Sequence, residues 1–300
     1  MQDPEGVAEA AAELTALGLP VEDGPERLGG MTNRVYRAGR LVLRLPGAGT
    51  EAYIDRAAEL VAARAAAAAG VAPPVVRADA ARGVMVTERV PGVTMTPALF
   101  AARKGAPGRA GTAFALLHAS DARFAARFEL FAMIDSYLAV LAPRAVALPA
   151  GWDAVLAAAE ALRPVLTDPA IPLAPCHCDP LCENFLDTGA RMWIVDWEYS
   201  GMNDPMWDLA DLSVEAGFTP AQEDEMLLGY FGRPAPMLSR ARMVTLKAMC
   251  DLLWTLWGLI QLSDGNPAED FRAYAEGRFA RCRALMQTAE FHGAVRTLGA

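Results

Sequence analysis

The sequence has 300 residues, 53% of them hydrophobic, and its formal net charge is −9 at pH 7. This length and apolar content allow a large buried core, divided between two lobes or domains. The negative charge argues against nucleic acid as a partner and is compatible with a small cationic ligand, although many proteins are acidic for solubility alone.

Two features bear on location. The N-terminal stretch MQDPEGVAEAAAEL lacks the basic and apolar segments of a signal peptide. The most apolar helical stretch, residues 244–262, contains Lys247 and Asp251, which are costly in lipid. We therefore expect a cytoplasmic protein without a membrane span.

The first ninety residues have the pattern of short strands around one helix. Residues 28–33, LGGMTN, are typical of a turn. Residues 34–37 and 41–45 alternate like strands, with Gly39 between them, and therefore predict a hairpin.

A helix is predicted over residues 50–69, which are strong helix formers. Thr50 is available as its N-cap, and Gly70 follows its end, where a left-handed residue is common. Residues 84–88 predict a further strand, and Pro91 with the following glycine breaks the chain. We place the lobe boundary at this break, which gives domains of residues 1–90 and 91–300.

Beyond residue 90 the hydrophobic spacing is mainly helical. Helices are predicted over residues 110–119, 131–141, 152–166, 205–216, 221–231, 240–262 and 267–288. Strands in the first lobe and helices in the second predict an α+β fold.

The five cysteines raise the question of a metal or redox site. Cys176, Cys178 and Cys182 lie close together in the sequence, whereas Cys250 and Cys282 are distant. An odd number in a chain this long argues against a disulfide framework. Structural zinc sites usually combine two closely spaced pairs, so zinc is the less favoured alternative to small buried side chains.

The segment CHCDPLCENFLD, residues 176–187, carries the residue types that phosphoryl transfer requires. That reaction needs a carboxylate to accept the proton of the attacking hydroxyl, and amide and carboxylate oxygens to hold magnesium. Asp179 and Asn184 are five residues apart, and Asp196 follows the apolar run WIV. A hairpin can therefore bring Asn184 and Asp196 to one ion.

Several segments resemble the choline/ethanolamine kinases in the aminoglycoside-phosphotransferase-like branch of the protein-kinase fold, especially the bacterial choline kinases. They are GGMTNRVY, LVLRLPG, CHCDPLCENFL, IVDWEYSGMNDPMWDLA and WTLWGLIQ. The resemblance implies a small antiparallel-sheet lobe with one main helix, a larger helical lobe, and ATP- and magnesium-dependent phosphorylation of a small amino-alcohol. It implies Asp179 as catalytic base, Asn184 and Asp196 as magnesium ligands, and His177 as a scaffold of the loop. Glu198 is expected to support the metal site and to take part in substrate binding.

The resemblance also bears on the nucleotide phosphates. Protein kinases hold them with a strand lysine paired to a helix glutamate, but the two lysines of this chain lie outside the first lobe. Arg44 occupies the matching strand, as in the choline-kinase-like relatives, and its forked donors can grip phosphate. The spacing shared with related kinases implies a mid-helix Glu59 as its partner, with Glu51 as the alternative.

Other nucleotide contacts are expected at the turn and between the lobes. Backbone amides of a glycine turn can approach phosphates, although such a turn alone is more often only a hairpin. The segment TERV falls where the kinase fold links its lobes, so its backbone should meet adenine. The expected contacts are Gly29, Gly30, Thr32, Asn33, Glu88 and Val90.

The acceptor is expected to bind the C-terminal helices. Trp254 and Trp257 are three residues apart on one helix face, with Asp251 another three upstream. Aromatic faces and carboxylates suit a quaternary ammonium, which cannot donate hydrogen bonds. The alternative is that both tryptophans are core residues. The resemblance favours the cation site and adds Glu215, Gln261, Phe271 and Tyr274.

The sequence thus favours a choline kinase. The alternative acceptors are ethanolamine, an aminoglycoside or another amino-alcohol, but an aminoglycoside would want many carboxylates and few aromatic faces. A catalytically silent nucleotide-binding protein is the alternative from another class. Asp179, Asn184 and Asp196 are all present, so nothing in the sequence supports a silent protein.

Overall fold

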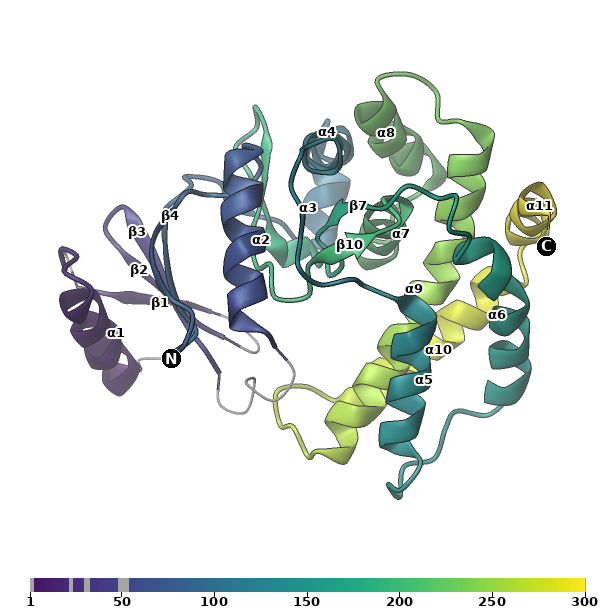
Figure 1. Ribbon diagram of the computed structural model, residues 1–300, viewed down its shortest axis with the longest axis horizontal. Coiled ribbons are helices and arrows are strands. Elements are labelled where there is room, and N and C mark those ends of the chain that lie inside the picture. Colours follow the sequence, from purple (N-terminus) through teal and green to yellow (C-terminus); the bar gives the residue numbers. More distant parts are fainter. Residues whose placement is uncertain (1–2, 22–23, 30–32, 48–53, 300) are drawn as a thin grey trace.

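The computed structural model describes residues 3–21, 24–29, 33–47 and 54–299. A smaller N-terminal part is built on a β-sheet, and a larger C-terminal part is mainly helical (Figure 1). The predicted α+β fold is confirmed. The boundary between residues 90 and 91 remains a prediction, although the sheet ends just before it.

The N-terminal sheet is antiparallel, with the order β1-β2-β3-β5-β4. Its strands are β1 (Glu26–Gly29), β2 (Arg34–Ala38), β3 (Leu41–Leu45), β4 (Val75–Asp79) and β5 (Val84–Glu88). The predicted hairpin is β2–β3, in which Tyr36 lies opposite Leu43. Burial alternates along β3, as expected for a strand with one face on a core.

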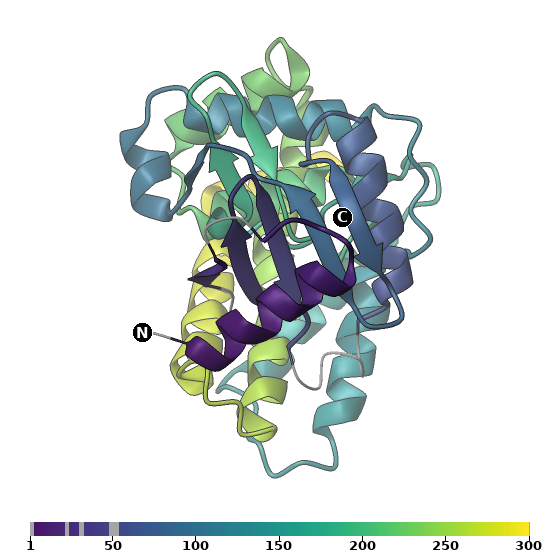
Figure 2. The same cartoon turned by 90° about the vertical axis from the view of Figure 1, so that its left-hand side faces the viewer.

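Helix α1 (Pro4–Ala16) covers the outer face of this sheet, and Figure 2 shows it lying across the strands. Its buried Ala10 and Leu14 pack with Tyr36 and Leu43 of the sheet. The side chain of Asp3 caps it by accepting a hydrogen bond from the amide of Gly6 at 2.9 Å. The expectation of one helix in the first ninety residues was therefore wrong, because the N-terminal segment rich in alanine and glutamate also forms a capped helix.

Helix α2 (Arg56–Ala68) begins later than predicted because Asp55 caps it, accepting hydrogen bonds from the amides of Ala57 and Ala58. Thr50, the expected cap, lies outside the described residues. Gly70 has a φ of 76°, so the prediction of a left-handed residue after the helix is confirmed. The alanine-rich face of α2 packs into the main core of the C-terminal part, which joins the two parts.

The C-terminal part combines helices with very short strands. Its helices are α3 (Pro97–Ala102), α4 (Ala106–His118), α5 (Leu130–Leu141), α6 (Trp152–Leu166), α7 (Met206–Glu215), α8 (Pro220–Phe231), α9 (Met237–Ser263), α10 (Phe271–Met286) and α11 (Ala289–Leu298). Its strands are β6 (Val93–Thr94), β7 (Ala174–Cys176), β8 (Phe185–Asp187), β9 (Met192–Ile194) and β10 (Gly201–Asn203).

The predicted helices of this part are all present. The helix over residues 152–166 has the predicted bounds, and the others end within four residues of the prediction. The largest differences are at α4 and α10; the latter starts late because Asp270 caps it through the amide of Ala273. Helices α3 and α11 were not predicted, and most of the strands of this part were also missed, since two or three residues carry no periodicity.

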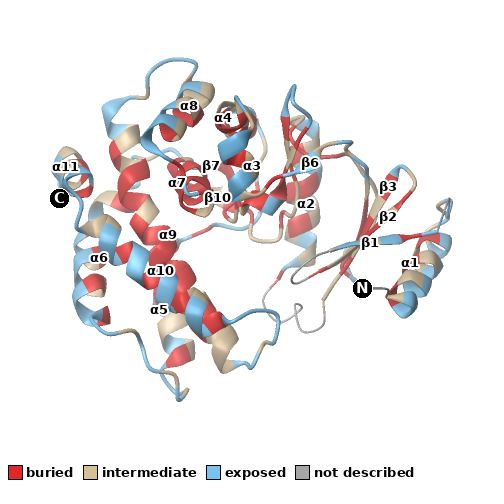
Figure 3. Cartoon of the chain, turned by 180° about the vertical axis from the view of Figure 1, so that it is seen from behind, coloured by how far each residue is buried: buried red, intermediate tan, exposed pale blue. Residues whose placement is uncertain are grey.

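Helix α9 lies at the centre of the C-terminal part. It is long and apolar enough to cross a membrane, but 89% of its most apolar window is buried within the protein. Figure 3 shows this burial along the helix. Its apolar character is therefore that of a core helix on which α7, α10 and α11 pack.

The hairpin β8–β9 is fixed to the neighbouring helices through Asp187 at the end of β8. This fully buried carboxylate accepts hydrogen bonds from Arg103 at 2.7 Å and from Arg109 at 2.6 and 2.9 Å. Burial by itself raises the pKa of Asp187, but the two arginines outweigh it and lower the pKa to about 2. The ion pairs of Asp187 with these two arginines position the hairpin that carries Asn184 and Asp196.

Replacing Asp187 with Asn should therefore lower the free energy of unfolding by about 1–3 kcal/mol. Because the pKa of Asp187 is depressed in the folded state, its contribution to the free energy of unfolding should be fully present above about pH 4. That contribution should be lost as the pH falls from about 4 to 2. Urea denaturation at several pH values measures both effects. Asp121→Asn, at an exposed position, is the control; equal stability of the two variants would contradict this role.

Candidate active site

A cavity of about 710 Å³ lies between the N-terminal sheet and the C-terminal helices. Most of the residues predicted to bind ligands line it. They are Asn33, Arg44, Glu59, Glu88, Val90, Asp179, Asn184, Asp196, Glu198, Glu215, Trp254, Trp257 and Tyr274. Gly29 ends β1 and is not among the lining residues, and Gly30 and Thr32 lie outside the described residues.

The loop that carries Asp179 is held from beneath by Asp208 of α7. The buried Asp208 carboxylate accepts hydrogen bonds from the backbone amides of His177 and Cys178, both at 2.8 Å. The indole of Trp207 donates to the carbonyl of Cys178 at 3.1 Å. Cys178 has a φ of 69°, a conformation that costs energy for a non-glycine residue and is held here by contacts on both sides.

His177 connects this loop to the residue before Asp196. Its Nε2 lies 2.9 Å from the carbonyl of Val195, and its Nδ1 accepts a hydrogen bond from the amide of Asp179 at 3.3 Å. Burial lowers the pKa of His177, which favours the neutral ring that these two contacts require. The ring therefore acts as a scaffold, as the sequence suggested.

The predicted hairpin brings Asn184 and Asp196 together. Strands β8 and β9 pair with Phe185 opposite Ile194, and the amide of Val195 donates to the carbonyl of Asn184 at 2.9 Å. Asn184 uses its amide nitrogen to bind the carbonyl of Asp179, which leaves its side-chain oxygen as an available ligand. Asp196 adopts a φ of 68°, which aspartate tolerates better than most residues.

The side chains here fit a hard divalent cation. Oδ1 of Asp196 is buried without a hydrogen-bond partner. Burial and the charge of Glu198 raise the pKa of Asp196 well above its usual range, so the anion needs a compensating positive charge. Carboxylate and amide oxygens are the ligands that magnesium prefers. Asn184 and Asp196 would hold such an ion.

Asp179 has the properties of a proton acceptor. Burial, followed by the charges of Glu198 and Glu215, raises its pKa to about 7. A carboxylate with a pKa near neutrality is well matched to general-base catalysis at physiological pH. The loop thus presents to the cavity a carboxylate whose pKa is raised to near neutrality.

An ion-pair network joins the sheet, α2 and the C-terminal part. Arg44 binds Glu59 at 2.7 Å, which confirms the expected pair, although Glu59 lies in the first turn of α2 rather than in mid-helix. Arg56 binds Glu59 at 2.9 Å and Glu198 at 3.2 Å. Asn33 donates to Glu198 at 2.9 Å. Glu51 lies outside the described residues.

Arg56 is a site residue that the sequence did not predict, because its partner Glu198 is distant in the chain. The network also places Glu198 beside Arg56 and Asn33 rather than among the aromatic residues. Its expected contribution to acceptor binding therefore receives no support from its contacts. Two arginines on a buried glutamate, one of them facing the cavity, make a cationic site suited to phosphate oxygens.

The opposite end of the cavity is apolar and borders the segment between the lobes. Val35, Val42, Met85 and Leu186 line it, and these side chains can pack against a planar base. The amides of Glu88 and Arg89 are already used, since they donate to the carbonyls of Pro74 and Arg40. The amide of Val90 is thus the better candidate for a hydrogen bond to a base.

Aromatic side chains from α9 and α10 form the third region of the cavity. Trp257 is half-buried, and its ring packs edge-on against Phe271 and Tyr274 with centroids 5.5 and 5.7 Å apart. Gly258 permits this packing, because a Cβ there would lie 2.6 Å from the Tyr274 ring. Trp257 and Tyr274 therefore form an aromatic wall in the cavity that Asp179 also lines.

The two tryptophans are not equivalent. Trp254 is only 4% exposed, and its indole donates to the buried Asp211 at 3.2 Å. It is largely a core residue that reaches the cavity edge, whereas Trp257 presents more surface. Phe271 is buried behind Trp257, and Gln261 accepts a hydrogen bond from Asn266.

Charged residues near the aromatic wall pair with one another. Glu215 pairs with Arg278 of α10, a residue that the sequence analysis missed. Asp251 is fully buried, binds Arg281 at 2.6 and 2.7 Å, and is not among the residues lining the cavity. The expectation that Asp251 faces a cationic ligand was therefore wrong, because the turn of α9 points it at α10.

The cysteines remain outside this chemistry. All five are free and buried, and burial raises the pKa of Cys176 and Cys178. Among the described residues, His118, Cys176 and Asp208 are close enough to share an ion. Each already has a protein partner, however: His118 contacts Tyr230 and Asp208, and the Cys176 thiol donates to a carbonyl. These contacts favour small buried side chains over a zinc site.

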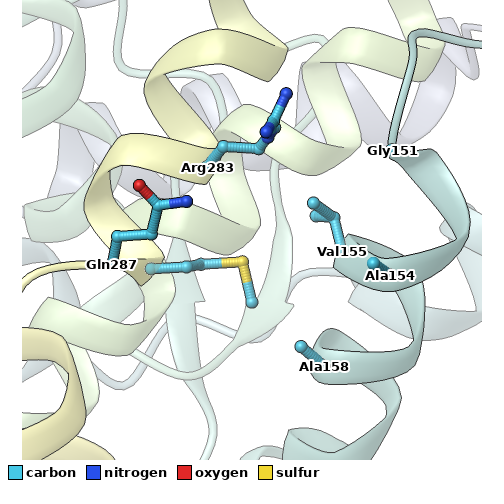
Figure 4. A pocket seen from close by; sticks show the side chains of 7 residues that line it. Gly151, Ala154, Val155, Ala158, Arg283 and Gln287 are labelled. Atoms are coloured by element: carbon cyan, nitrogen blue, oxygen red, sulfur yellow. The ribbon is translucent and has the colours of Figure 1, made fainter.

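A smaller hollow of about 250 Å³ lies between α6 and α10 (Figure 4). Its lining residues are Gly151, Ala154, Val155, Ala158, Arg283, Met286 and Gln287. This set offers no proton acceptor comparable to Asp179. The chemistry is therefore assigned to the larger cavity.

Comparisons with known proteins agree with this geometry. Residues 24–244 match the model of a phosphotransferase enzyme family. A choline/ethanolamine kinase family protein from Mesorhizobium loti is 58% identical, with a TM-score of 0.91 and 98% of each chain covered. Choline kinase LicA from Streptococcus pneumoniae is 26% identical, with a TM-score of 0.78, over 94% of this chain and 98% of that chain.

A structure of LicA in complex with AMP is 26% identical, with a TM-score of 0.75, over 95% of this chain and 99% of that chain. The matched family model spans the cavity residues up to Glu215, and the Mesorhizobium structure spans nearly the whole chain. The chain therefore belongs to the phosphotransferase enzyme family and is a small-molecule kinase of the choline/ethanolamine kinase group.

Proposed function

We propose that this kinase transfers the γ-phosphoryl group of ATP to the hydroxyl of choline. The observation that carries the proposal is the half-buried Trp257, packed with Tyr274 beside Glu215 and Asp179 in one cavity. A trimethylammonium group binds well to aromatic faces near a carboxylate. An aminoglycoside would need more polar acceptors than this wall provides, and ethanolamine is the nearest alternative.

In the proposed reaction Asp179 accepts the proton of the choline hydroxyl. The hydroxyl oxygen forms a bond to the γ-phosphorus, and the bond between the γ-phosphorus and the β–γ bridging oxygen breaks. The products are phosphocholine and ADP. Arg44, oriented by Glu59, binds phosphate oxygens, and the apolar end of the cavity binds adenine. Magnesium, held by Asn184 and Asp196, would neutralise phosphate charge.

The use of ATP and the free cysteines support a cytoplasmic location.

A substrate panel tests the proposal directly. Choline, ethanolamine and aminoglycosides are each assayed with ATP and magnesium by the release of ADP. We expect choline to give the highest kcat/KM. Preferential turnover of another amine, or ATP binding with no turnover of any, would reject it.

Asp179→Asn should lower kcat by roughly two to four orders of magnitude, because the variant cannot accept the hydroxyl proton. ATP affinity, measured by calorimetry, should change little. The control is Asp153→Asn at an exposed position on α6. Activity of the Asp179 variant within a few-fold of wild type would show that another group is the base.

Asp196→Ala should abolish magnesium-dependent nucleotide binding or turnover, because it removes the buried unpartnered carboxylate. In contrast, replacing Cys176, Cys178 and Cys182 together with alanine should leave kcat within a few-fold of wild type in folded protein. Metal analysis accompanies the kinetics. Stoichiometric zinc that disappears with the cysteines would contradict our assignment.

Trp257→Ala should cost about 0.5–2 kcal/mol of choline binding, which corresponds to a several-fold to roughly thirtyfold rise in the KM for choline. The KM for ATP should not change. Trp193→Ala, on the β8–β9 hairpin and outside the cavity lining, is the control. If Trp257→Ala lowers thermal stability but leaves the KM for choline unchanged, the indole is a core residue only.

A further inference from the structure

The acceptor end of the cavity contains a cation of its own. Arg278 is 7% exposed and lines the cavity, and its guanidinium pairs with Glu215. The guanidinium carbon also lies over the ring of Tyr274, 4.8 Å from its centre. Arg278 thus contacts both the acidic and the aromatic components of the proposed acceptor site.

The second carboxylate near Arg278 is already satisfied. Asp251 lies 3.4 Å from Arg278, but it makes two shorter hydrogen bonds to Arg281, at 2.6 and 2.7 Å. The charge of Arg278 is therefore directed mainly to Glu215. Among the carboxylates that line the cavity, Glu215 is therefore the one whose charge Arg278 offsets.

We propose that Arg278 makes the acceptor site selective against primary ammonium groups; this inference rests on the proposed choline kinase function. A primary ammonium is strongly hydrated and must replace its water with hydrogen-bond acceptors. Arg278 already pairs with Oε1 of Glu215, so a primary ammonium that binds this carboxylate brings two positive charges together.

A quaternary ammonium avoids most of this conflict. It has no N–H groups to satisfy, its hydration is weaker, and it gains its contact energy from the faces of the aromatic wall. It therefore does not need direct hydrogen bonds from Glu215. Occupation of Glu215 by Arg278 should penalise ethanolamine more than choline, which is discrimination through an unfavourable contact with the wrong ligand.

The test compares Arg278→Gln with Arg281→Gln. Both residues lie on α10 and bind Asp251, but only Arg278 pairs with Glu215. Arg278→Gln should raise the kcat/KM for ethanolamine relative to that for choline by about tenfold, a change typical of one altered charged contact. Arg281→Gln should leave the ratio within about twofold. An unchanged ratio for Arg278→Gln, or equal shifts in both variants, would overturn the inference.

Arg278→Lys separates charge from shape. It keeps the positive charge and should retain most of the preference for choline. A ratio like that of Arg278→Gln would overturn the charge argument. Wild-type turnover of choline tests the proposed function independently. Failure of the proposed function can therefore be distinguished from failure of the Arg278 inference.

The buried position of Arg278 makes a measurement on the wild-type protein necessary as well. Calorimetry in the absence of nucleotide should show affinity rising with each added methyl group from ethanolamine to choline. This series remains informative if Arg278→Gln does not fold. Equal or tighter binding of ethanolamine would overturn the inference.

Discussion

The geometry of the site depends on one buried carboxylate, that of Asp208. It is fully inaccessible and accepts hydrogen bonds from the amides of His177 and Cys178, while the ring of His118 contacts it at 2.9 Å. A buried carboxylate is tolerated only when its oxygens are satisfied. Because both amides come from consecutive loop residues, few backbone conformations meet that requirement, and the one observed includes the left-handed Cys178.

The same constraint extends to the side of the cavity where Asn184 and Asp196 are proposed to bind magnesium. His177, whose amide is held by Asp208, contacts the carbonyl of Val195 with its ring, and Asp196 follows directly. Asp179, the proposed proton acceptor, and the unpartnered carboxylate of Asp196 are thus positioned through one chain of hydrogen bonds that starts on α7. Asp208 and Arg278 have different roles. Asp208 fixes the backbone of the loop that carries Asp179, whereas Arg278 changes the charge of the site that binds the acceptor.

The sequence predicted the parts of the fold that have local patterns. The β2–β3 hairpin and helix α6 follow from periodicity and turn residues, and the placing of Asn184 and Asp196 at the open end of the β8–β9 hairpin follows from the short hairpin. Partners distant in the sequence were missed: Asp208 and Arg56 act through contacts that no local pattern encodes. Similarly, a spacing of three places Trp254 and Trp257 on one face, but only packing against α7 and α10 decides which indole remains accessible.

The arginine that replaces the usual strand lysine has a consequence for chemical probes of nucleotide sites. The chain has two lysines, Lys104 and Lys247, and neither lines the cavity. Lys247 is instead paired with Glu223. A guanidinium remains protonated at neutral pH and is a poor nucleophile, whereas a lysine amine can be acylated when it loses its proton. ATP analogues that carry an amine-reactive acyl group would therefore find no lysine to label at the proposed nucleotide site, and profiling methods that identify kinases by a tagged lysine would overlook the enzyme.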